Sequence, residues 1–308
     1  MKWKKMGQIY CPSGRYGWDE HSAITPTPLL LDEETIRVYV GFRDREGISR
    51  IGYVDVKADN PSKVLDVSNK PVLDIGLPGA FDDNGVILGD VIKYKGQVRM
   101  YYVGFQLVKK VKFLAFSGLA TSKDGGYTFK RVSSVPILDR ADEGIYIRAI
   151  HSVMFENGVW KTWYAAGSRW EYIGGKPYPS YEIRYTKSPD GVNFHEKKGT
   201  LVIPSNEKEY GIGRPRVYKF NGKYYMFYTK GVKKRNYFDY LPGYAESTDG
   251  IHWIRKDSRI GIAPSKTGWD SKMVCYPSLI QYGDRIYMFY NGNDMGKTGF
   301  GYAILEEW

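Results

Sequence analysis

The sequence has few cysteines and few histidines, and it contains no long apolar run. Its two cysteines, Cys11 and Cys275, are too few for a disulfide framework and do not form a CxxC pair, so a redox pair and a zinc knuckle are not indicated. We expect both to be ordinary thiols. No apolar stretch approaches the length of about twenty residues that a membrane-spanning helix needs. The charged N-terminus is not followed by the apolar segment of a secretory signal, so a cytoplasmic location is expected.

Aromatic residues and glycine are abundant. Phe, Trp and Tyr make up 16% of the chain, which also has 35 glycines and 15 prolines. This mixture favours strands and tight turns over long helices. The hydrophobic content of 42% is enough for a packed core and excludes disorder. The net charge of +11 draws attention to anionic partners, so the placement of the basic residues matters.

A strand-like run of aromatic residues recurs along the whole chain. The equivalent positions are Val40, Tyr102, Tyr164, Tyr228 and Tyr290, which are separated by 62, 62, 64 and 62 residues. Each run follows an apolar strand that ends in a hairpin turn, and precedes a third and a fourth strand. Five copies with four antiparallel strands each predict an all-β fold, a single five-bladed β-propeller domain over residues 1–308.

The two ends of the chain complement each other in this pattern. The last copy ends after its third strand, and residues 3–10 have the character of the missing fourth strand. We therefore predict that residues 3–10 form the outer strand of the last blade. This strand would close the ring and cover an edge that would otherwise invite aggregation.

A functional site is expected at one mouth of the central channel, where the inner strands and the loops that leave them converge. The polar and aromatic residues that the repeat places there form a mixed set of acids, arginines and rings. We expect substrate to be bound by His21, Arg43, Asp82, Arg148, His151, Trp170, Arg214, Asp270, Tyr276 and Asn291.

Several short motifs in these repeats resemble a known group of enzymes. They are the Tyr-Gly strand ends, Phe42-Arg43-Asp44, Asp82-Asp-Asn-Gly-Val, Arg214-Pro, Tyr276-Pro and Asn291-Gly-Asn. Together they resemble the superfamily of glycoside hydrolase families 43, 62, 32, 68 and 130 over nearly the whole chain. The resemblance implies a five-bladed propeller and sugar chemistry.

The resemblance also implies a set of carboxylates in the central pocket, because acetal chemistry needs a proton donor and an ionised partner. Asp19 is the first candidate for the base or nucleophile and Asp44 the second. Asp82, Asp83 or Asp90 would fill the orienting role. The usual acid in the fourth blade is replaced by Gly213-Arg214-Pro215, so that Glu171 or Asp270 substitutes for it or glycosidase chemistry has been lost. The catalytic set that we predict is Asp19, Asp44, Asp83 and Glu171.

Arginines gather where the missing acid would be. Arg43, Arg148, Arg169, Arg214 and Arg216 would all approach the same mouth if the repeats align. Guanidinium groups suit carboxylates and phosphates. Phosphorylases of family 130 need a basic cradle for inorganic phosphate, and an anionic sugar would use the same groups. We therefore expect an anionic or phosphorylated saccharide as partner.

Other partners are not indicated. The basic run Lys109-Lys-Val-Lys lacks a helix or stacking motif, so we interpret it as a solvated rim and expect neither a nucleic acid nor a membrane as partner. No histidine pair has the spacing of metal ligands, and no cofactor is expected, although carbonyls and water could hold an axial Ca²⁺ or Na⁺.

Two classes of function remain open at this point. One is a glycoside hydrolase-like enzyme or phosphorylase, and the other is a sugar-binding propeller without turnover. Two carboxylates facing each other across the mouth, roughly 5 to 10 Å apart, would favour the hydrolase. Carboxylates turned away from the channel or held in ion pairs would argue against it.

Overall fold

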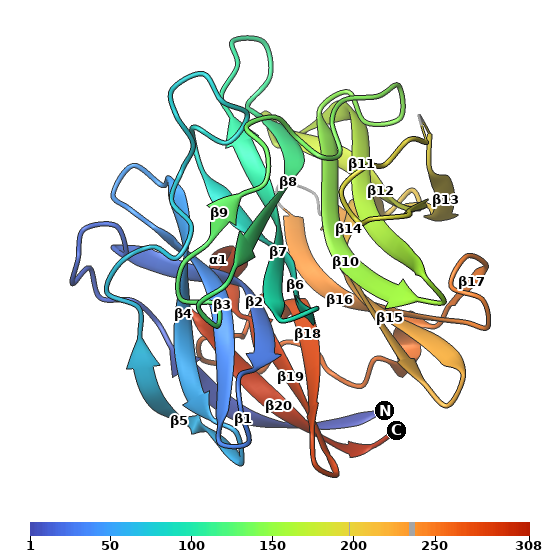
Figure 1. Cartoon of the computed structure of the whole chain (residues 1–308). Helices are drawn as coiled ribbons and strands as arrows, with labels where there is room; N and C mark the ends of the chain where they lie inside the picture. Colours follow the sequence, from blue (N-terminus) through green and yellow to red (C-terminus); the bar gives the residue numbers. More distant parts are fainter. Residues whose placement is uncertain (197, 234–237) are drawn as a thin grey trace.

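A computed structural model describes residues 1–196, 198–233 and 238–308 and shows an all-β chain (Figure 1). The expected all-β class is confirmed. Two short helical turns, η1 (Asp257–Arg259) and α1 (Asn293–Gly296), interrupt the strands. Over the described residues, the antiparallel pairings group the strands into five successive units.

The five units each follow the chain from an inner to an outer strand. Their strands are β2 (His21–Leu30), β3 (Thr35–Arg43), β4 (Ser49–Lys57) and β5 (Asn60–Val67); β6 (Val86–Tyr94), β7 (Gln97–Gln106), β8 (Leu114–Ser122) and β9 (Lys130–Arg131); β10 (Ile147–Glu156), β11 (Val159–Ile173), β12 (Lys176–Ser188) and β13 (Thr200–Ile203); β14 (Glu209–Phe220), β15 (Lys223–Lys233), β16 (Phe238–Ser247) and β17 (Trp253–Arg255); and β18 (Cys275–Tyr282), β19 (Arg285–Asn291) and β20 (Phe300–Glu307), completed by β1 (Lys2–Tyr10). A short parallel pairing between β8 and β10 joins the second and third units.

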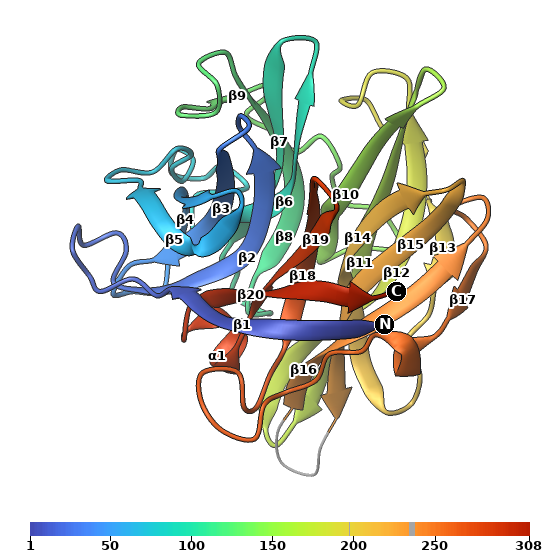
Figure 2. The same ribbon diagram turned by 90° about the horizontal axis from the view of Figure 1, so that it is seen from below.

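The N-terminal strand completes the last unit, as the sequence predicts. β1 pairs antiparallel with β20, with Lys4 opposite Ile304 and Gln8 opposite Gly301. Figure 2 shows the two strands side by side, with both chain ends at the same place. The edge of β20 is thereby covered, which removes a row of unpaired backbone groups from solvent.

The recurring Asp-Gly turns tie neighbouring units together. A buried aromatic side chain on the second strand of one unit donates a hydrogen bond to a glycine carbonyl in the Asp-Gly turn of the next. The bonds join Tyr39 to Gly126, Tyr101 to Gly191 and Trp163 to Gly250, at 2.9, 2.9 and 2.8 Å. Since a buried polar group needs a partner, these turns and aromatic residues form one structural device.

Each inner strand carries an irregularity at the same point of the repeat. The register to the second strand shifts around Thr25, Gly89, His151, Arg214 and Tyr276. Thr25, Arg214 and Tyr276 have positive φ angles of 56°, 50° and 56°. At Gly89, an added Cβ would lie 2.1 Å from the carbonyl oxygen of Ile150, so this position requires glycine. Bulges re-aim side chains, and these five set the geometry of the site.

Candidate functional site

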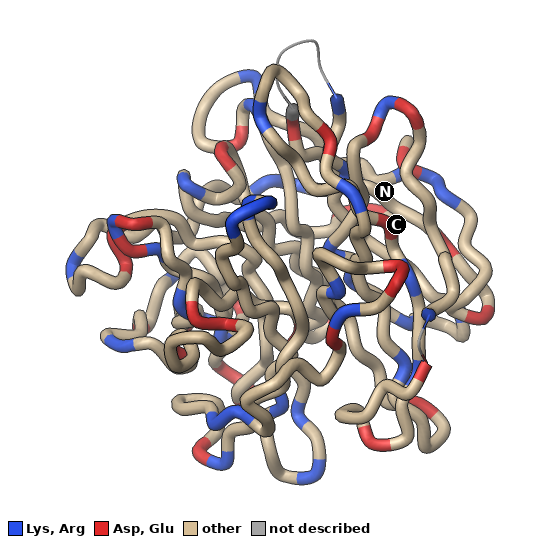
Figure 3. The backbone as a smooth tube through the Cα atoms, turned by 90° about the horizontal axis from the view of Figure 1, so that it is seen from above, with Lys and Arg blue, Asp and Glu red and all other residues tan. Residues whose placement is uncertain are grey.

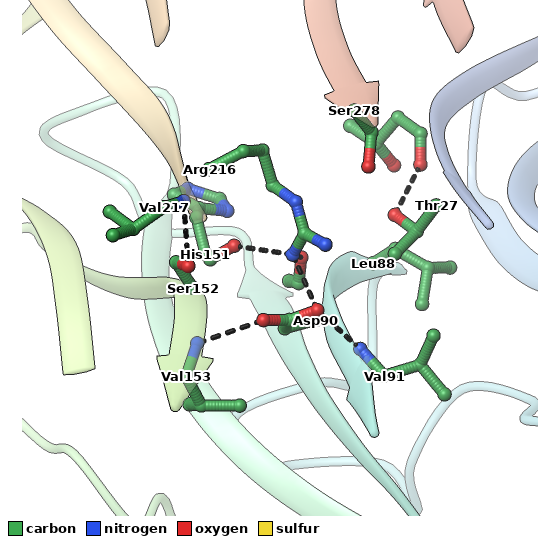
Figure 4. Close-up of polar contacts among 12 residues, drawn as sticks. Thr27, Leu88, Asp90, Val91, His151, Ser152, Val153, Arg216, Val217 and Ser278 are labelled. Carbon is green, nitrogen blue, oxygen red and sulfur yellow. Dashed lines mark hydrogen bonds and ion pairs between the residues drawn. The ribbon is translucent and has the colours of Figure 1, made fainter. Parts of the chain in front are cut away.

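A layer of paired polar groups lies among the inner strands (Figure 4). The Asp90 carboxylate accepts hydrogen bonds from the backbone N–H groups of Val91 and Val153, both at 2.8 Å. It also forms an ion pair with Arg216, with Nη1 and Oδ1 2.5 Å apart. Arg216 donates a further hydrogen bond to the carbonyl of His151 at 2.9 Å. Burial opposes the charge of Arg216, but Asp90 outweighs it and raises the pKa of the guanidinium above its ordinary value.

Ser152 extends this layer from β10 to β14. Its hydroxyl accepts a hydrogen bond from the backbone N–H of Val217 at 3.0 Å (Figure 4). Ser152 and Val217 are both buried. Apart from the Nε of Arg216, which is buried without a partner, the polar groups named here pair with one another and hold neighbouring inner strands together.

A pocket of about 300 Å³ opens beside this layer. Four of the five bulge residues line it: Thr25, His151, Arg214 and Tyr276. Most of the remaining lining is apolar or aromatic, with Arg43 and Lys112 as further cations. The aromatic lining consists of Phe105, Phe113, Tyr178, Tyr181 and Tyr240. Among the described residues, no aspartate or glutamate lines this pocket.

Arg214 lines the pocket and forms no ion pair with a described residue. Its Nη2 donates hydrogen bonds to the carbonyl of Thr25 and the hydroxyl of Thr27, at 3.1 and 2.8 Å, and Nη1 donates to the carbonyl of Leu88 at 2.5 Å. These partners are neutral, and Arg214 is only 3% exposed. Burial, followed by repulsion from Arg216, lowers the pKa of Arg214 to about 9.

Arg43 ends β3 and is the second cation of the pocket. Its guanidinium forms no ion pair and no hydrogen bond with any residue that the structure describes, and its Nε is buried without a partner. Burial lowers the pKa of Arg43 from its ordinary value. The residue is half-buried, so a guanidinium without a described partner remains open to an incoming anion.

The other two titratable bulge residues are neutral near pH 7. Burial, and then the positive charges of Arg214 and Arg216, hold the pKa of His151 well below its usual value of 6.5. Burial raises the pKa of Tyr276 well above 10. The pocket therefore combines cationic side chains, neutral hydroxyl and imidazole groups, and an aromatic wall, which is the chemistry of a site for an anionic organic ligand.

The structure brings four of the predicted binding residues together: Arg43, His151, Arg214 and Tyr276 all line the pocket. Two others support it or lie beside it. Asn291 accepts a hydrogen bond from the backbone N–H of Thr25 at 2.8 Å and so fixes that bulge. Trp170 packs edge-on against Phe113, with ring centroids 5.2 Å apart, and lines a neighbouring hollow.

The remaining four predicted binding residues lie outside the pocket lining. Asp82 is paired with Arg131 at 2.7 Å, Arg148 with Glu143 at 3.2 Å, and Asp270 with Lys5 at 2.6 Å, while the Nδ1 of His21 lies 2.7 Å from the hydroxyl of Ser22. The first three are held in ion pairs that hold the fold together. A role for these four in binding substrate remains a prediction.

None of the four carboxylates predicted to be catalytic lines the pocket. Asp44 is paired with Arg50 at 2.7 Å, and Glu171 with Lys233 at 2.8 Å. Asp44 also accepts hydrogen bonds from two backbone N–H groups of its own turn, which accounts for its position.

The other two carboxylates of that set cap local turns. Asp19 is 2% exposed and accepts a hydrogen bond from the backbone N–H of Tyr16 at 2.8 Å. Asp83 accepts one from the backbone N–H of Gly79, also at 2.8 Å. The pair of carboxylates that would face each other across the mouth is therefore not found in the pocket lining, and a catalytic role for all four remains a prediction.

Several lining residues were not expected from the sequence, namely Thr25, Lys112, Tyr181, Thr229 and Tyr240. Thr25 carried a usable signal, because it precedes a proline at the same point of the repeat as Arg214 and Tyr276. Tyr181 and Tyr240 come from third strands, and their hydroxyls lie 2.9 Å apart. Nothing in the spacing of the repeats distinguishes them from the many core tyrosines.

The described residues offer no cluster of metal ligands and no membrane span. No three His, Cys, Asp or Glu side chains in the described ranges are placed to hold a metal ion. In the same ranges, no helix is long and apolar enough to cross a membrane. Figure 3 shows acidic and basic residues mixed along the outer loops.

Comparison with known proteins gives relatives over the full length. The chain is 31% identical over 307 residues to "Uncharacterized protein Rv1502" of Mycobacterium tuberculosis (strain ATCC 25618 / H37Rv), covering 99% of this chain and 100% of that protein. It is 32% identical over 131 residues to 1,2-beta-oligomannan phosphorylase of Thermoanaerobacter sp. (strain X514), covering 41% of this chain and 44% of the relative.

A family profile and solved structures extend this comparison. The profile of glycoside hydrolase family 130, described as beta-1,4-mannooligosaccharide phosphorylase, matches residues 172–240. A solved structure of a glycoside hydrolase superposes with a TM-score of 0.74 at 20% identity, covering 98% of this chain and 90% of that protein. A glycoside hydrolase of the GH130 family of mannoside phosphorylases, which targets beta-1,2 mannosidic linkages in Candida mannan, gives a TM-score of 0.69 at 15% identity, with coverages of 98% and 93%.

These matches confirm the resemblance that the sequence motifs indicate, and with it a carbohydrate-active protein of the glycoside hydrolase-like or phosphorylase type. The match over the full length shows the family, and the chain belongs to the family of Rv1502.

Proposed function

We propose that this protein binds a saccharide through an anionic group, a carboxylate or a phosphate, in the pocket between Arg43 and Arg214. The observation that carries the proposal is the charge balance of the pocket. Arg43 has no described partner, Arg214 has only neutral ones, and no described carboxylate lines the cavity. Burying cations without counterions is costly, and a ligand that supplies the negative charge recovers that cost.

The rest of the pocket suits a sugar. Rings of Phe105, Phe113 and Tyr181 form part of the wall, and aromatic faces pack against the C–H groups of a pyranose. The hydroxyls of Tyr240 and Thr229 provide polar contacts within the same lining. A volume of about 300 Å³ fits a monosaccharide with one anionic substituent and not a long oligosaccharide.

The same proposal includes a five-bladed propeller as the scaffold. Support comes from the five strand units and from bulges at residues 25, 89, 151, 214 and 276, spaced by 64, 62, 63 and 62 residues. In such an arrangement, equivalent residues of successive blades converge on one axis. Four of these five residues line one pocket, in keeping with that convergence.

Phosphorolysis is the second candidate, favoured by the match to family 130 and by the 1,2-beta-oligomannan phosphorylase among the relatives. Inorganic phosphate would bind the arginines and attack the anomeric carbon as the glycosidic C–O bond breaks, and the leaving oxygen would take a proton. Such a reaction needs one proton donor, and the predicted acids Asp83 and Glu171 lie outside the pocket lining. Binding alone needs no donor, which is why the pocket supports recognition first.

Replacing Arg43 tests the proposal directly. We expect Arg43→Met to weaken binding of mannose 1-phosphate and of glucuronate at least about tenfold, because charge-assisted hydrogen bonds contribute about 1.5–3 kcal/mol. The thermal stability should stay the same or rise, since the guanidinium has no described partner to lose. Calorimetric titration measures the first effect, and a melting curve measures the second.

Arg45→Met is the matched control. Arg45 lies two residues from Arg43, its side chain is 88% exposed, and the substitution removes the same charge. It should leave both affinities unchanged. Equal affinities for the Arg43 and Arg45 variants would refute the proposed anion site. Release of mannose 1-phosphate from a mannooligosaccharide in the presence of inorganic phosphate would establish the second candidate.

A further inference from the structure

A second hollow of about 290 Å³ lies beside the pocket. Its lining combines lysines with aromatic and apolar side chains: Lys109, Lys110, Val111, Lys112, Trp170, Tyr172 and Pro177. Lys112 and Pro177 line both cavities, so the hollow continues the pocket outward.

Two segments that depart from the repeat build this hollow. One is the loop 107–113 between β7 and β8, which carries the lysines. The other is the β11–β12 hairpin, in which β11 has 15 residues where β3 has 9 and β7 has 10. The extra length is regular hairpin, with Trp170 opposite Pro179 and Tyr172 opposite Pro177, and it ends in a Gly174-Gly175 turn with positive φ at both residues. The hollow is thus an addition to the common blade.

An aromatic wall runs from the pocket into the hollow. Phe105 and Phe113 pack edge to face with centroids 5.2 Å apart, and Phe113 packs on Trp170 in the same way at 5.2 Å. Beyond them, Tyr172 is 76% exposed. The indole Nε1 of Trp170 is buried without a partner, and an unpaired buried donor in a lined hollow calls for an acceptor.

The charge of the hollow has no internal counterpart. Lys109, Lys110 and Lys112 are exposed and form no ion pair with a described residue. The nearest acid along the chain from Trp170 is Glu171, which is paired with Lys233 at 2.8 Å. Lysine clusters on a rim are usually solvated, but these three share their lining with an aromatic wall and an unpaired donor.

We propose that the hollow binds a second anionic group of the same ligand, together with a planar or apolar unit that packs on Trp170 and Tyr172. This inference rests on the proposed function, because the first anionic group occupies the pocket at Arg43. The ligand class is a saccharide extended by a charged substituent. A nucleotide diphosphate on the sugar and a second uronate in a disaccharide both supply that chemistry.

Removing the two outer lysines tests this subsite. We expect Lys109→Ala/Lys110→Ala to weaken binding of a doubly anionic probe at least fivefold and to change mannose 1-phosphate binding less than twofold. GDP-mannose and digalacturonate serve as the two probes, and loss of affinity for one alone identifies the source of the second charge. The control is Lys63→Ala/Lys70→Ala, which removes the same charge from two exposed lysines of another unit.

Trp170→Phe provides a second measurement that does not alter charge. A smaller phenyl ring replaces the indole and the Nε1–H donor is lost, so affinity for the probe identified above should fall about threefold. Equal weakening of both probes by the lysine pair and by its control would overturn the second subsite, as would no weakening by either variant. Retained binding of mannose 1-phosphate in the lysine variant, with its loss in Arg43→Met, would show that the pocket functions without the hollow.

Discussion

Arg214 and Arg216 lie two residues apart on β14, and their surroundings differ sharply. Arg216 is paired with Asp90 at 2.5 Å, and its pKa is raised above the ordinary value. Arg214 has only neutral partners, and its pKa is lowered to about 9 by burial and by its neighbour. Both side chains are almost fully buried, at 3% and 6% exposure.

The two arginines show a cation with a counterion and a cation without one on the same strand. Arg216 is buried next to the Asp90 carboxylate, which also accepts hydrogen bonds from two backbone N–H groups. Two residues away on the same strand, Arg214 lines the pocket, where no described carboxylate is present. A buried charge without a counterion costs stability, so its retention is explained if a ligand provides the missing charge.

The largest expected effect on stability comes from removing the counterion of Arg216. Asp90→Asn leaves Arg216 buried without its counterion and should lower the free energy of unfolding by about 3–5 kcal/mol. Urea unfolding measures the change. Asp284→Asn, at an exposed turn position, is the control and should shift stability by less than about 0.5 kcal/mol. A loss below about 1 kcal/mol for Asp90→Asn would mean that Asp90 does not neutralise Arg216.

Anion binding at Arg214 should depend on pH in the alkaline range, above the range in which a histidine titrates. Arg214 binds its proton below about pH 9 and loses it above, so affinity for an anion should fall as pH rises through 9. Glucuronate, whose charge is fixed over this range, should bind equally between pH 6 and 8 and roughly tenfold more weakly at pH 10. His151 adds no slope there, because its pKa is held well below 6.5. A rise in affinity on acidification from pH 8 to 6 would contradict this assignment.

Much of the fold could be predicted from the sequence, because each repeat contains the residue types that are typical of strands and turns. Aromatic strand ends recur in all five units and Asp-Gly turns in three of them, and the character of residues 3–10 predicts the β1–β20 pairing. The same repeat predicts that Arg43, His151, Arg214 and Tyr276 lie close together, and all four line one pocket.

The remaining features of the site depend on side-chain contacts that the spacing of the sequence repeats does not predict. Asp44 stands next to Arg43 in the sequence, yet it pairs with Arg50 and caps its own loop outside the pocket lining. Trp170 was expected in the site, but the extended hairpin places it in the hollow beside the pocket. Tyr240 reaches the pocket from a third strand, and no pattern separates it from core tyrosines.

The smallest expected effect on stability comes from removing two buried hydroxyl groups, one at a time. Ser152 accepts a hydrogen bond from Val217 in the polar layer, while the Thr25 hydroxyl in the pocket is buried without a partner. Ser152→Ala removes the acceptor of a buried N–H and should cost about 1–3 kcal/mol. Thr25→Val removes a hydroxyl that is already unsatisfied, so stability should be unchanged or slightly higher.

Both variants can be measured by the same urea titration, and each serves as the control of the other. Valine keeps the β-branched shape of threonine, so the strain at the positive φ of 56° is common to parent and variant. Only the hydrogen-bonding state of the hydroxyl then differs between the two sites. Equal losses for both variants would show that the Thr25 hydroxyl is satisfied in solution, and the contrast between the polar layer and the pocket would then rest on the arginines alone.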